Sequence, residues 1–321
     1  MGFALLWLWT IQMSMGQGRL LTERSVASRC LGTNRTVRIY LPPSYGREPR
    51  RRYPVLYLHD GQNAFSSAGP HGCFGWGSWE LDRIVDGLCA ANQMREIIMV
   101  AIDNSSTRYQ EYRGPAQSSA EQERAAQKRK SPAAGDPTAF ENYANFLRQE
   151  LKPQIDREFR TLPGAAHTGV LGSSLGGICS LALAWEHSRT FGLAASLSGS
   201  FQIEKRQFLD AVLGRYKGRR KPLKIYLDSG TIDFTGDDDG RRMTAAVAAE
   251  LRRIGWRDEI NLKHFVDLKP MTEAELDQAR LRRDKWEEAR RSQHNEFYWR
   301  QRVWRALVFL FPPERLKSRG I

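Results

Sequence analysis

Residues 168–186 read TGVLGSSLGGICSLALAWE, and this stretch decides the fold class that the sequence predicts. Its first four residues form a short apolar strand, and apolar residues recur at helical spacing from residue 178 onward. The pattern G-x-S-x-G lies at the junction and is centred on Ser174. A strand that turns sharply into a helix puts the central serine in a strained conformation, with its hydroxyl exposed above a sheet. The stretch therefore predicts an α/β fold that carries a nucleophilic serine.

Short apolar strands alternate with amphipathic helices along most of the chain. Several of the strands are continuous apolar runs, which is typical of parallel strands covered on both faces. Besides the strand before Ser174, the predicted strands cover residues 37–42, 54–59, 97–102, 192–198, 223–228 and 260–266. The predicted helices cover 139–151, interrupted at Pro153, then 243–254 and about 296–311. We expect a single catalytic domain over 19–321, with a mostly parallel central sheet and helices on both of its faces.

Two stretches look like insertions over the active site of such a sheet. Residues 113–138 are charged, rich in Ala, Gln and Ser, and without periodicity. They predict a mobile loop over the carboxyl edge of the sheet. Residues 271–292 begin with a capping box at Thr272 and Glu275, and they predict a charged helix.

Composition and charge limit the class of protein. The chain has 321 residues and a net charge of +13, and it contains no apolar run of transmembrane length, so we expect no stable membrane insertion. The basic residues lie in short, separate clusters without interleaved aromatic repeats, so we expect no nucleic-acid partner. The four cysteines lack C-x-x-C spacing, which argues against structural zinc. The sequence does not decide whether Cys73 and Cys89 form a disulfide bridge.

The first 18 residues read as a signal peptide or a disordered leader. Residues 3–11 are apolar, and small residues suited to a signal peptidase follow at 14–16, but no Lys or Arg precedes the apolar run. We expect a periplasmic or secreted protein, with a cytoplasmic location as the alternative.

A serine hydroxyl is a weak nucleophile and needs a base within hydrogen-bond distance. Of the six histidines, His294 lies after the last predicted strand and just before the final helix, where the chain order Ser, Asp or Glu, His puts the base. An acid between the two should orient it. Asp233 follows strand 223–228 and is our choice. Asp228 is nearer the strand interior, and Asp237–Asp239 lie further along, in what we interpret as a solvated turn.

Acyl transfer also needs donors for a negatively charged oxygen. One should be the backbone N–H of Leu175, which follows the nucleophile directly. The other should come from the loop after strand 54–59, where Gly61 and Gln62 are the candidates. A glycine there lets the backbone turn inward toward a substrate.

The chain resembles an esterase family of α/β-hydrolases that includes enterochelin esterases, feruloyl and acetyl-xylan esterases, and esterase D. The resemblance runs from about Ser28 to Phe311. Several separate motifs carry it in the right order: RTVRIYLPP at 35–43, YPVLYLHDGQN at 53–63, AIDN at 101–104, Arg108, Glu111-Tyr112, GSSLGG at 172–177, and His294-Asn295-Glu296 followed by Trp299.

This resemblance implies an α/β-hydrolase fold, a serine, histidine and aspartate triad, and no metal or other cofactor. It also suggests that Asn104, Arg108 and Tyr112 lie near the rim of the active site, with bracing of the loop after strand 97–102 as the equal alternative. Two departures from the family pattern are the helix within 271–292, which lengthens the path to the histidine, and the insertion at 113–138. The substrate of any one family member therefore cannot be copied across.

These observations predict a serine carboxylic-ester hydrolase that works through an acyl-enzyme. Its substrate would be a small-molecule or carbohydrate-linked ester, such as a short acyl, feruloyl, acetyl-sugar or siderophore ester. An acyltransferase with the same triad, or a non-catalytic basic binding protein on the same scaffold, are the alternatives.

Overall fold

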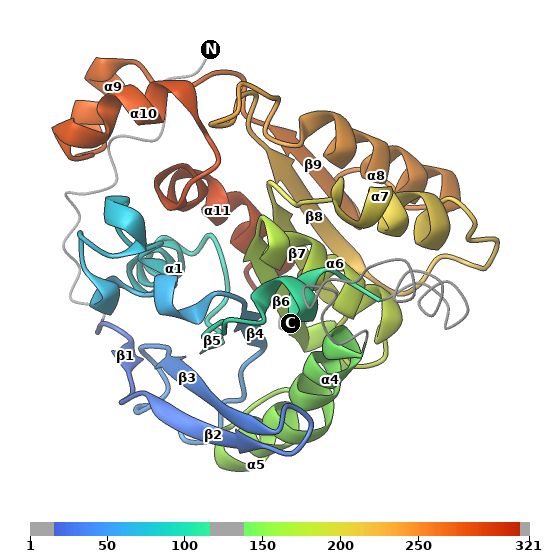
Figure 1. Ribbon diagram of the computed structural model, residues 1–321. Helices are drawn as coiled ribbons and strands as arrows, with labels where there is room; N and C mark the ends of the chain where they lie inside the picture. The colour runs from blue at the N-terminus through green and yellow to red at the C-terminus, as the bar shows by residue number, and fades with distance from the viewer. Residues whose placement is uncertain (1–15, 116–137, 315–321) are drawn as a thin grey trace, which may run out of the picture.

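The computed structural model describes residues 16–115 and 138–314, whose strands form one nine-stranded mixed sheet (Figure 1). The strand order is β1-β3-β5-β4-β6-β7-β8-β9, and β2 pairs with β3. The strands are β1 (Arg19–Leu20), β2 (Arg24–Ser28), β3 (Thr33–Leu41), β4 (Val55–Leu58), β5 (Ile98–Ile102), β6 (Thr168–Ser173), β7 (Leu193–Leu197), β8 (Lys224–Ser229) and β9 (Leu262–Val266).

The strands from β4 to β9 are parallel, while β1, β2 and β5 each pair antiparallel with β3. The prediction of a mostly parallel α/β sheet is confirmed, and each of the seven strands read from apolar runs is present. Strands β1 and β2 were not predicted from the sequence. Both are short, and β2 (RSVAS) buries only alternate residues, so neither forms an apolar run.

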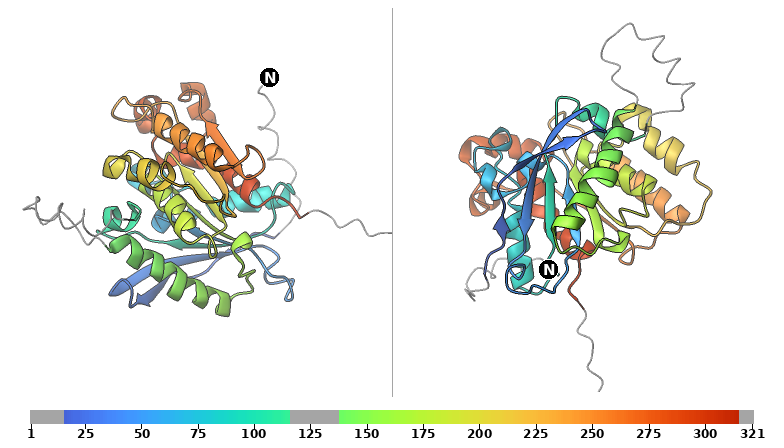
Figure 2. Two further views of the ribbon diagram at one scale, coloured as in Figure 1. Left: turned by 90° about the vertical axis from the view of Figure 1, so that its right-hand side faces the viewer. Right: turned by 90° about the horizontal axis from the view of Figure 1, so that it is seen from below.

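Helices cover both faces of the sheet (Figures 1 and 2). On one face lie α4 (Ala139–Asn145), α5 (Lys152–Glu158), α6 (Leu175–Glu186) and α8 (Arg241–Ile254). On the other lie α1 (Leu81–Ala90) and α11 (Glu296–Leu310). Val170 and Leu171 are neighbours in β6 but belong to opposite cores, because successive side chains of a strand point to opposite faces.

The remaining elements are short. They are α2 (Arg108–Tyr112), α7 (Ile203–Gln207), α9 (Glu273–Gln278), α10 (Trp286–Arg291), the π-helical segments η4 (Phe146–Leu151) and η6 (Phe208–Leu213), and the 3₁₀ turns η1 (Gly61–Asn63), η2 (Ser66–Ala68), η3 (Cys73–Gly75), η5 (Ala165–His167) and η7 (Arg283–Lys285).

Two helix predictions need correction. Pro153 does not interrupt the helix that begins at Ala139, because the chain passes through the π-helical η4 and Pro153 then occupies the first turn of α5, where a missing N–H costs little. Residues 271–292 do not form one helix. The capping box at Thr272 and Glu275 is present, but it starts the six-residue α9, which is followed by η7 and α10.

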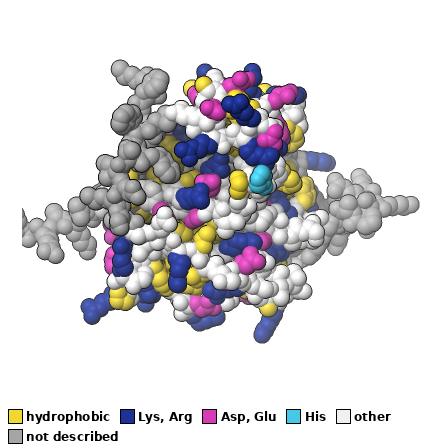
Figure 3. Space-filling view, turned by 90° about the vertical axis from the view of Figure 1, so that its left-hand side faces the viewer, with side chains coloured by type: hydrophobic (Ala, Val, Ile, Leu, Met, Phe, Trp, Pro, Cys, Tyr) yellow, Lys and Arg dark blue, Asp and Glu magenta, His cyan; other side chains and the backbone are white. Residues whose placement is uncertain are grey.

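Most of the predicted loop at 113–138, and most of the predicted leader, lie outside the described residues. The four cysteines are free thiols, so Cys73 and Cys89 do not form a bridge. Within the described residues, none of the helices has the length and apolar character needed to span a membrane. Lys and Arg side chains are spread over the face shown in Figure 3, with Asp and Glu among them.

Candidate active site

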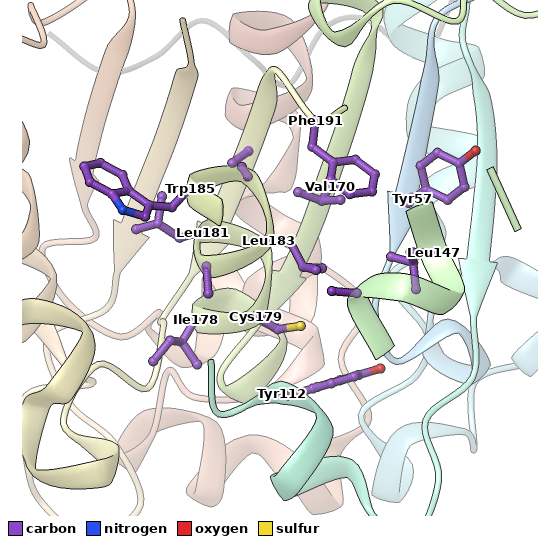
Figure 4. Packing of buried hydrophobic residues seen from close by; sticks show 14 of the residues in the cluster. Tyr57, Tyr112, Leu147, Val170, Ile178, Cys179, Leu181, Leu183, Trp185 and Phe191 are labelled. Carbon is purple, nitrogen blue, oxygen red and sulfur yellow. The ribbon is translucent and has the colours of Figure 1, made fainter. Parts of the chain in front are cut away.

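Ser174 lies at the sharp turn between β6 and α6, with φ of 54° and ψ of −122°. This strained geometry is the one that the G-x-S-x-G pattern predicts. A β-carbon at Gly172 would lie 2.6 Å from the backbone of Gly176, so only glycine fits there. Helix α6 is held against the sheet by buried side chains that include Ile178, Leu181 and Trp185 (Figure 4). Ser174 is therefore held at the start of a helix that is packed tightly against the sheet.

His294 reaches Ser174 from the loop between α10 and α11. Its Nε2 lies 2.9 Å from Ser174 Oγ, and its Nδ1 lies 2.6 Å from Asp239 Oδ1. Because an ionised carboxylate only accepts hydrogen bonds, the Nδ1–H donates to Asp239 and Nε2 is left to accept the serine proton. The ring packs edge-on against Trp299 and Phe234, at centroid distances of 5.0 and 6.1 Å.

The acid beside His294 is Asp239, and the choice of Asp233 is wrong. Asp233 Oδ1 instead accepts hydrogen bonds from the N–H and hydroxyl of Thr235 and from the N–H of Asp237, which close a local turn. The acidic run is also not uniformly solvated. Asp237 is exposed, whereas Asp239 is 1% exposed and ends the loop just before α8. The loop after β8 thus continues past Asp233 before it returns to the histidine.

A buried polar network holds Asp239. Its Oδ2 accepts from Ser198 Oγ at 2.7 Å and from the N–H of Gly230, and the guanidinium of Arg302 lies 3.4 Å away. Burial alone would raise the pKa of Asp239, but the hydrogen bond from His294 and the charge of Arg302 outweigh it and lower that pKa. The carboxyl is therefore ionised and aimed at the imidazole.

Asp228, the alternative acid, contacts Arg302 of this network rather than His294. It is the second-last residue of β8, is fully buried, and pairs with Arg302 at 3.2 Å. Burial raises its pKa to about 6, against the opposing effect of Arg302 and with a further rise from Asp239. The guanidinium of Arg302 thus lies within 4 Å of three carboxyls, those of Asp228, Asp239 and Asp267, and of these Asp239 is the one that contacts His294.

The candidate oxyanion donors lie at the starts of two helical segments, where N–H groups have no acceptor within the helix. Leu175 is the first residue of α6, and Gly61 and Gln62 open η1. A β-carbon at Gly61 would lie 2.5 Å from the backbone of Ile102 in β5, so glycine is required for this close approach. The side-chain oxygen of Gln62 accepts from the N–H of Asn104, which fixes the loop further.

The three residues expected at the rim instead brace Asp60, which precedes η1. Arg108 forms a two-bond fork to Asp60 at 2.6 and 2.7 Å, and Asn104 donates to the same carboxylate at 2.6 Å. Tyr112 is fully buried, and its hydroxyl accepts from the N–H of Asp60 at 3.4 Å. The rim interpretation is therefore wrong for Tyr112, and the bracing alternative describes all three contacts.

Glu296, in the first turn of α11, is a buried carboxyl close to the site that the sequence analysis did not single out. It is 8% exposed, and its Oε1 accepts from the side-chain amide of Asn63 at 3.1 Å. Burial raises the pKa of Glu296 to about 7, Asp60 adds to the rise, and the charges of His294 and Arg108 oppose it. The motif His294-Asn295-Glu296 includes this residue, but nothing in the motif indicates that its side chain is buried.

Replacing Glu296 by glutamine is expected to stabilise the protein at neutral and alkaline pH. A folded pKa of about 7, above the ordinary 4.5, means that the folded state binds more protons between these values. The associated stability is complete below pH 4.5 and is lost as pH rises through 7, a fall of roughly 3 kcal/mol at most. Glutamine does not titrate, so the difference between the two proteins isolates this residue.

Urea unfolding of both proteins from pH 5 to pH 8 measures this effect. The free energy of unfolding of Glu296→Gln minus that of the parent should increase across the range. A constant difference would contradict the buried, titrating carboxyl.

Among residues 16–115 and 138–314, which the structure describes, no group of three or more His, Cys, Asp or Glu side chains could hold a metal ion. The chemistry available at the site is that of a serine hydroxyl, an imidazole, a carboxylate and backbone N–H groups.

Comparison with known proteins identifies the family of the chain. A family model described as "Putative esterase" matches residues 28–310. The chain belongs to this esterase family. The family match confirms the resemblance inferred from the motifs. The predicted α/β-hydrolase fold is confirmed as well.

Individual relatives of this esterase are distant. A curated Bacillus subtilis (strain 168) protein, "Uncharacterized protein YbbA", is 23% identical over 178 residues, which are 53% of this chain and 59% of YbbA. The chain thus matches about three-fifths of that relative's length.

Two solved structures resemble the esterase over most of its length. A ferulic acid esterase is 17% identical with a TM-score of 0.62, covering 92% of this chain and 98% of its own. The enterobactin esterase FES from Shigella flexneri is 19% identical with a TM-score of 0.61, covering 90% of this chain and 58% of its own. At these identities the likeness establishes the fold.

Proposed function

We infer that this esterase is a serine carboxylic-ester hydrolase in which Ser174, His294 and Asp239 act as a catalytic triad. The observation that carries the proposal is the continuous hydrogen-bond chain from Ser174 Oγ through both nitrogens of His294 to a buried carboxylate. Scaffold packing does not require this trio, whereas nucleophilic catalysis does. These hydrogen bonds therefore favour an enzyme over a non-catalytic binding protein.

The reaction follows from the positions of the protons. His294 Nε2 accepts the proton of Ser174 as Oγ attacks the ester carbonyl, while the Nδ1–H stays on the imidazole and donates to Asp239. The N–H of Leu175 and an N–H of Gly61 or Gln62 stabilise the oxyanion. His294 then protonates the departing alcohol. Water, deprotonated by the same imidazole, releases the acid and restores Ser174.

The substrate class that we propose is a small-molecule or carbohydrate-linked ester. Support comes from two proteins of similar fold, a ferulic acid esterase and an enterobactin esterase. The exposed ring of Phe234 beside His294 offers an apolar contact for an acyl or alcohol group.

Rapid-mixing kinetics with p-nitrophenyl acetate and butyrate test the proposal. An acyl-enzyme predicts a burst of p-nitrophenol, and mass spectrometry of the quenched protein should find an acetyl group on Ser174. Analysis of the products in the presence of sugars or alcohols separates hydrolysis from acyl transfer. Absence of turnover with every ester, together with no reaction of Ser174 with a fluorophosphonate, would contradict the proposal.

Replacing Arg108 by glutamine is expected to lower kcat/KM by the same factor for anionic and neutral esters. The guanidinium is already engaged by Asp60, so its loss acts by releasing the loop that carries Gly61. Removing one partner of such a pair leaves a partly buried charge without its counterion. The measurement compares two esters of similar size at several salt concentrations. A selective loss for the anionic ester would give Arg108 a direct contact with substrate.

A further inference from the structure

The first turns of α11 hold the long segment between β4 and α1. Glu296 accepts from the amide of Asn63, and Arg300 donates to the carbonyl of Ser78 at 3.0 Å. Between them the rings of Trp299 and Trp79 pack at a centroid distance of 5.9 Å. These contacts join residues more than 200 positions apart in the chain.

This contact region connects two parts of the active site. Asn63 belongs to η1 with Gly61 and Gln62, and its carbonyl accepts from the N–H of Trp79 at 2.9 Å. On the other side, Glu296 is two residues from His294, and Trp299 packs against the His294 ring. The hydrogen bond between Asn63 and Glu296 is thus a direct side-chain connection between η1 and the segment that carries the base.

We propose that Glu296 is a positioning residue that fixes η1 relative to His294 through its hydrogen bond with Asn63. The inference rests on the proposed function, because it assigns the connection to the oxyanion donors of that reaction. Donors and base must be held to within a fraction of an ångström in the transition state, so a small displacement of η1 reduces the rate without removing any catalytic group.

The surroundings of Glu296 explain why the side chain carries a hydrogen-bond acceptor. Burying a polar group is unfavourable unless it is hydrogen-bonded, and Asn63 supplies that bond. The carboxyl also lies in the field of Asp60 and His294, on the two segments that it joins, and of Arg108 in α2, which pairs with Asp60. An apolar residue of similar size would fill the space but leave the Asn63 amide without its acceptor.

Four variants test the proposal: Glu296→Ala, Glu296→Gln, Asn63→Ala and the double variant Asn63→Ala/Glu296→Ala. Each alanine variant should lower kcat by about 10- to 100-fold with little change in KM, because the loss appears in the transition state. The double variant should be no worse than the poorer single one, since both remove one interaction. Glutamine keeps an oxygen acceptor and should restore most of the rate.

Three further measurements distinguish a positioning role from a general loss of structure. Glu287→Ala removes an exposed glutamate of α10 and should leave kcat unchanged. Binding of phenylboronic acid, which mimics the tetrahedral intermediate, should weaken by the same factor as kcat in the two alanine variants if the oxyanion site has shifted. Thermal unfolding of each variant establishes that it is folded at the assay temperature.

Additive losses in the double variant, or an unchanged kcat in Glu296→Ala, would overturn the positioning role. Ser174→Ala is measured in the same assay. If that variant keeps its activity, the proposed function itself fails. If it is inactive while Glu296→Ala is normal, only the present inference fails.

Discussion

Replacing Ser174 by alanine is expected to abolish ester hydrolysis while leaving the fold intact. The change removes one hydroxyl that is partly exposed at the turn, so it creates no cavity, and alanine keeps the β-carbon that the backbone already accommodates. Loss of the nucleophile in a serine hydrolase lowers kcat by a factor on the order of 10⁶. The residual rate from the oxyanion site and substrate binding should be close to the detection limit.

The measurement is kcat for p-nitrophenyl butyrate, with circular dichroism and thermal unfolding as checks on folding. Ser173→Ala is the matched control, because Ser173 is the preceding serine of the same motif but is buried in β6. An inactive Ser173→Ala beside an active Ser174→Ala would show that the motif has been assigned to the wrong serine.

Replacing Asp239 by asparagine is also expected to lower kcat by several orders of magnitude. An asparagine side chain can donate to Nδ1 and favours the imidazole tautomer in which Nε2 carries the proton and cannot accept one from Ser174. The corresponding substitution in a serine protease lowers kcat by about 10⁴. Asp233→Asn, by contrast, alters a turn at the protein surface and should change kcat by no more than roughly twofold.

The comparison of these two variants decides which carboxyl serves His294. Both enzymes should be assayed across pH, because a substituted acid can shift the pH at which the imidazole becomes an active base. A normal rate for Asp239→Asn together with a collapse for Asp233→Asn would reverse the assignment made from the hydrogen bonds.

The contrast between His294 and Asp239 shows what a sequence can reveal about this site. Ser174 follows from a local pattern, and His294 follows from its place between the last strand and the last helix, so neither needs the path of a loop to be known. The acid lies on a loop with several aspartates, and a turn closed by Asp233 carries the chain past the expected position. Nothing in the local sequence indicates which aspartate turns inward.

The same reasoning accounts for Asp60 and Glu296. Their partners, Arg108 and Asn63, are distant in the chain, and each pairing depends on how loops from different strands meet at one edge of the sheet. The apolar strands were predictable because burial on both faces affects every residue of the strand. A single polar contact across loops leaves no such periodic signal.

Arg302 has a consequence for how this protein can change over evolution. The side chain is 1% exposed and lies within 3.2 to 3.9 Å of Asp228, Asp239 and Asp267. Losing one member of such a buried group leaves a charge without a partner and costs about 3–5 kcal/mol, whereas replacing charged partners together by apolar residues can be neutral. Because the total free energy of unfolding is about 5–15 kcal/mol, a single substitution of this kind would remove a large part of the stability. Positions 228 and 302 should therefore vary together among relatives, and an aligned set in which they vary independently would show that the two charges are not coupled.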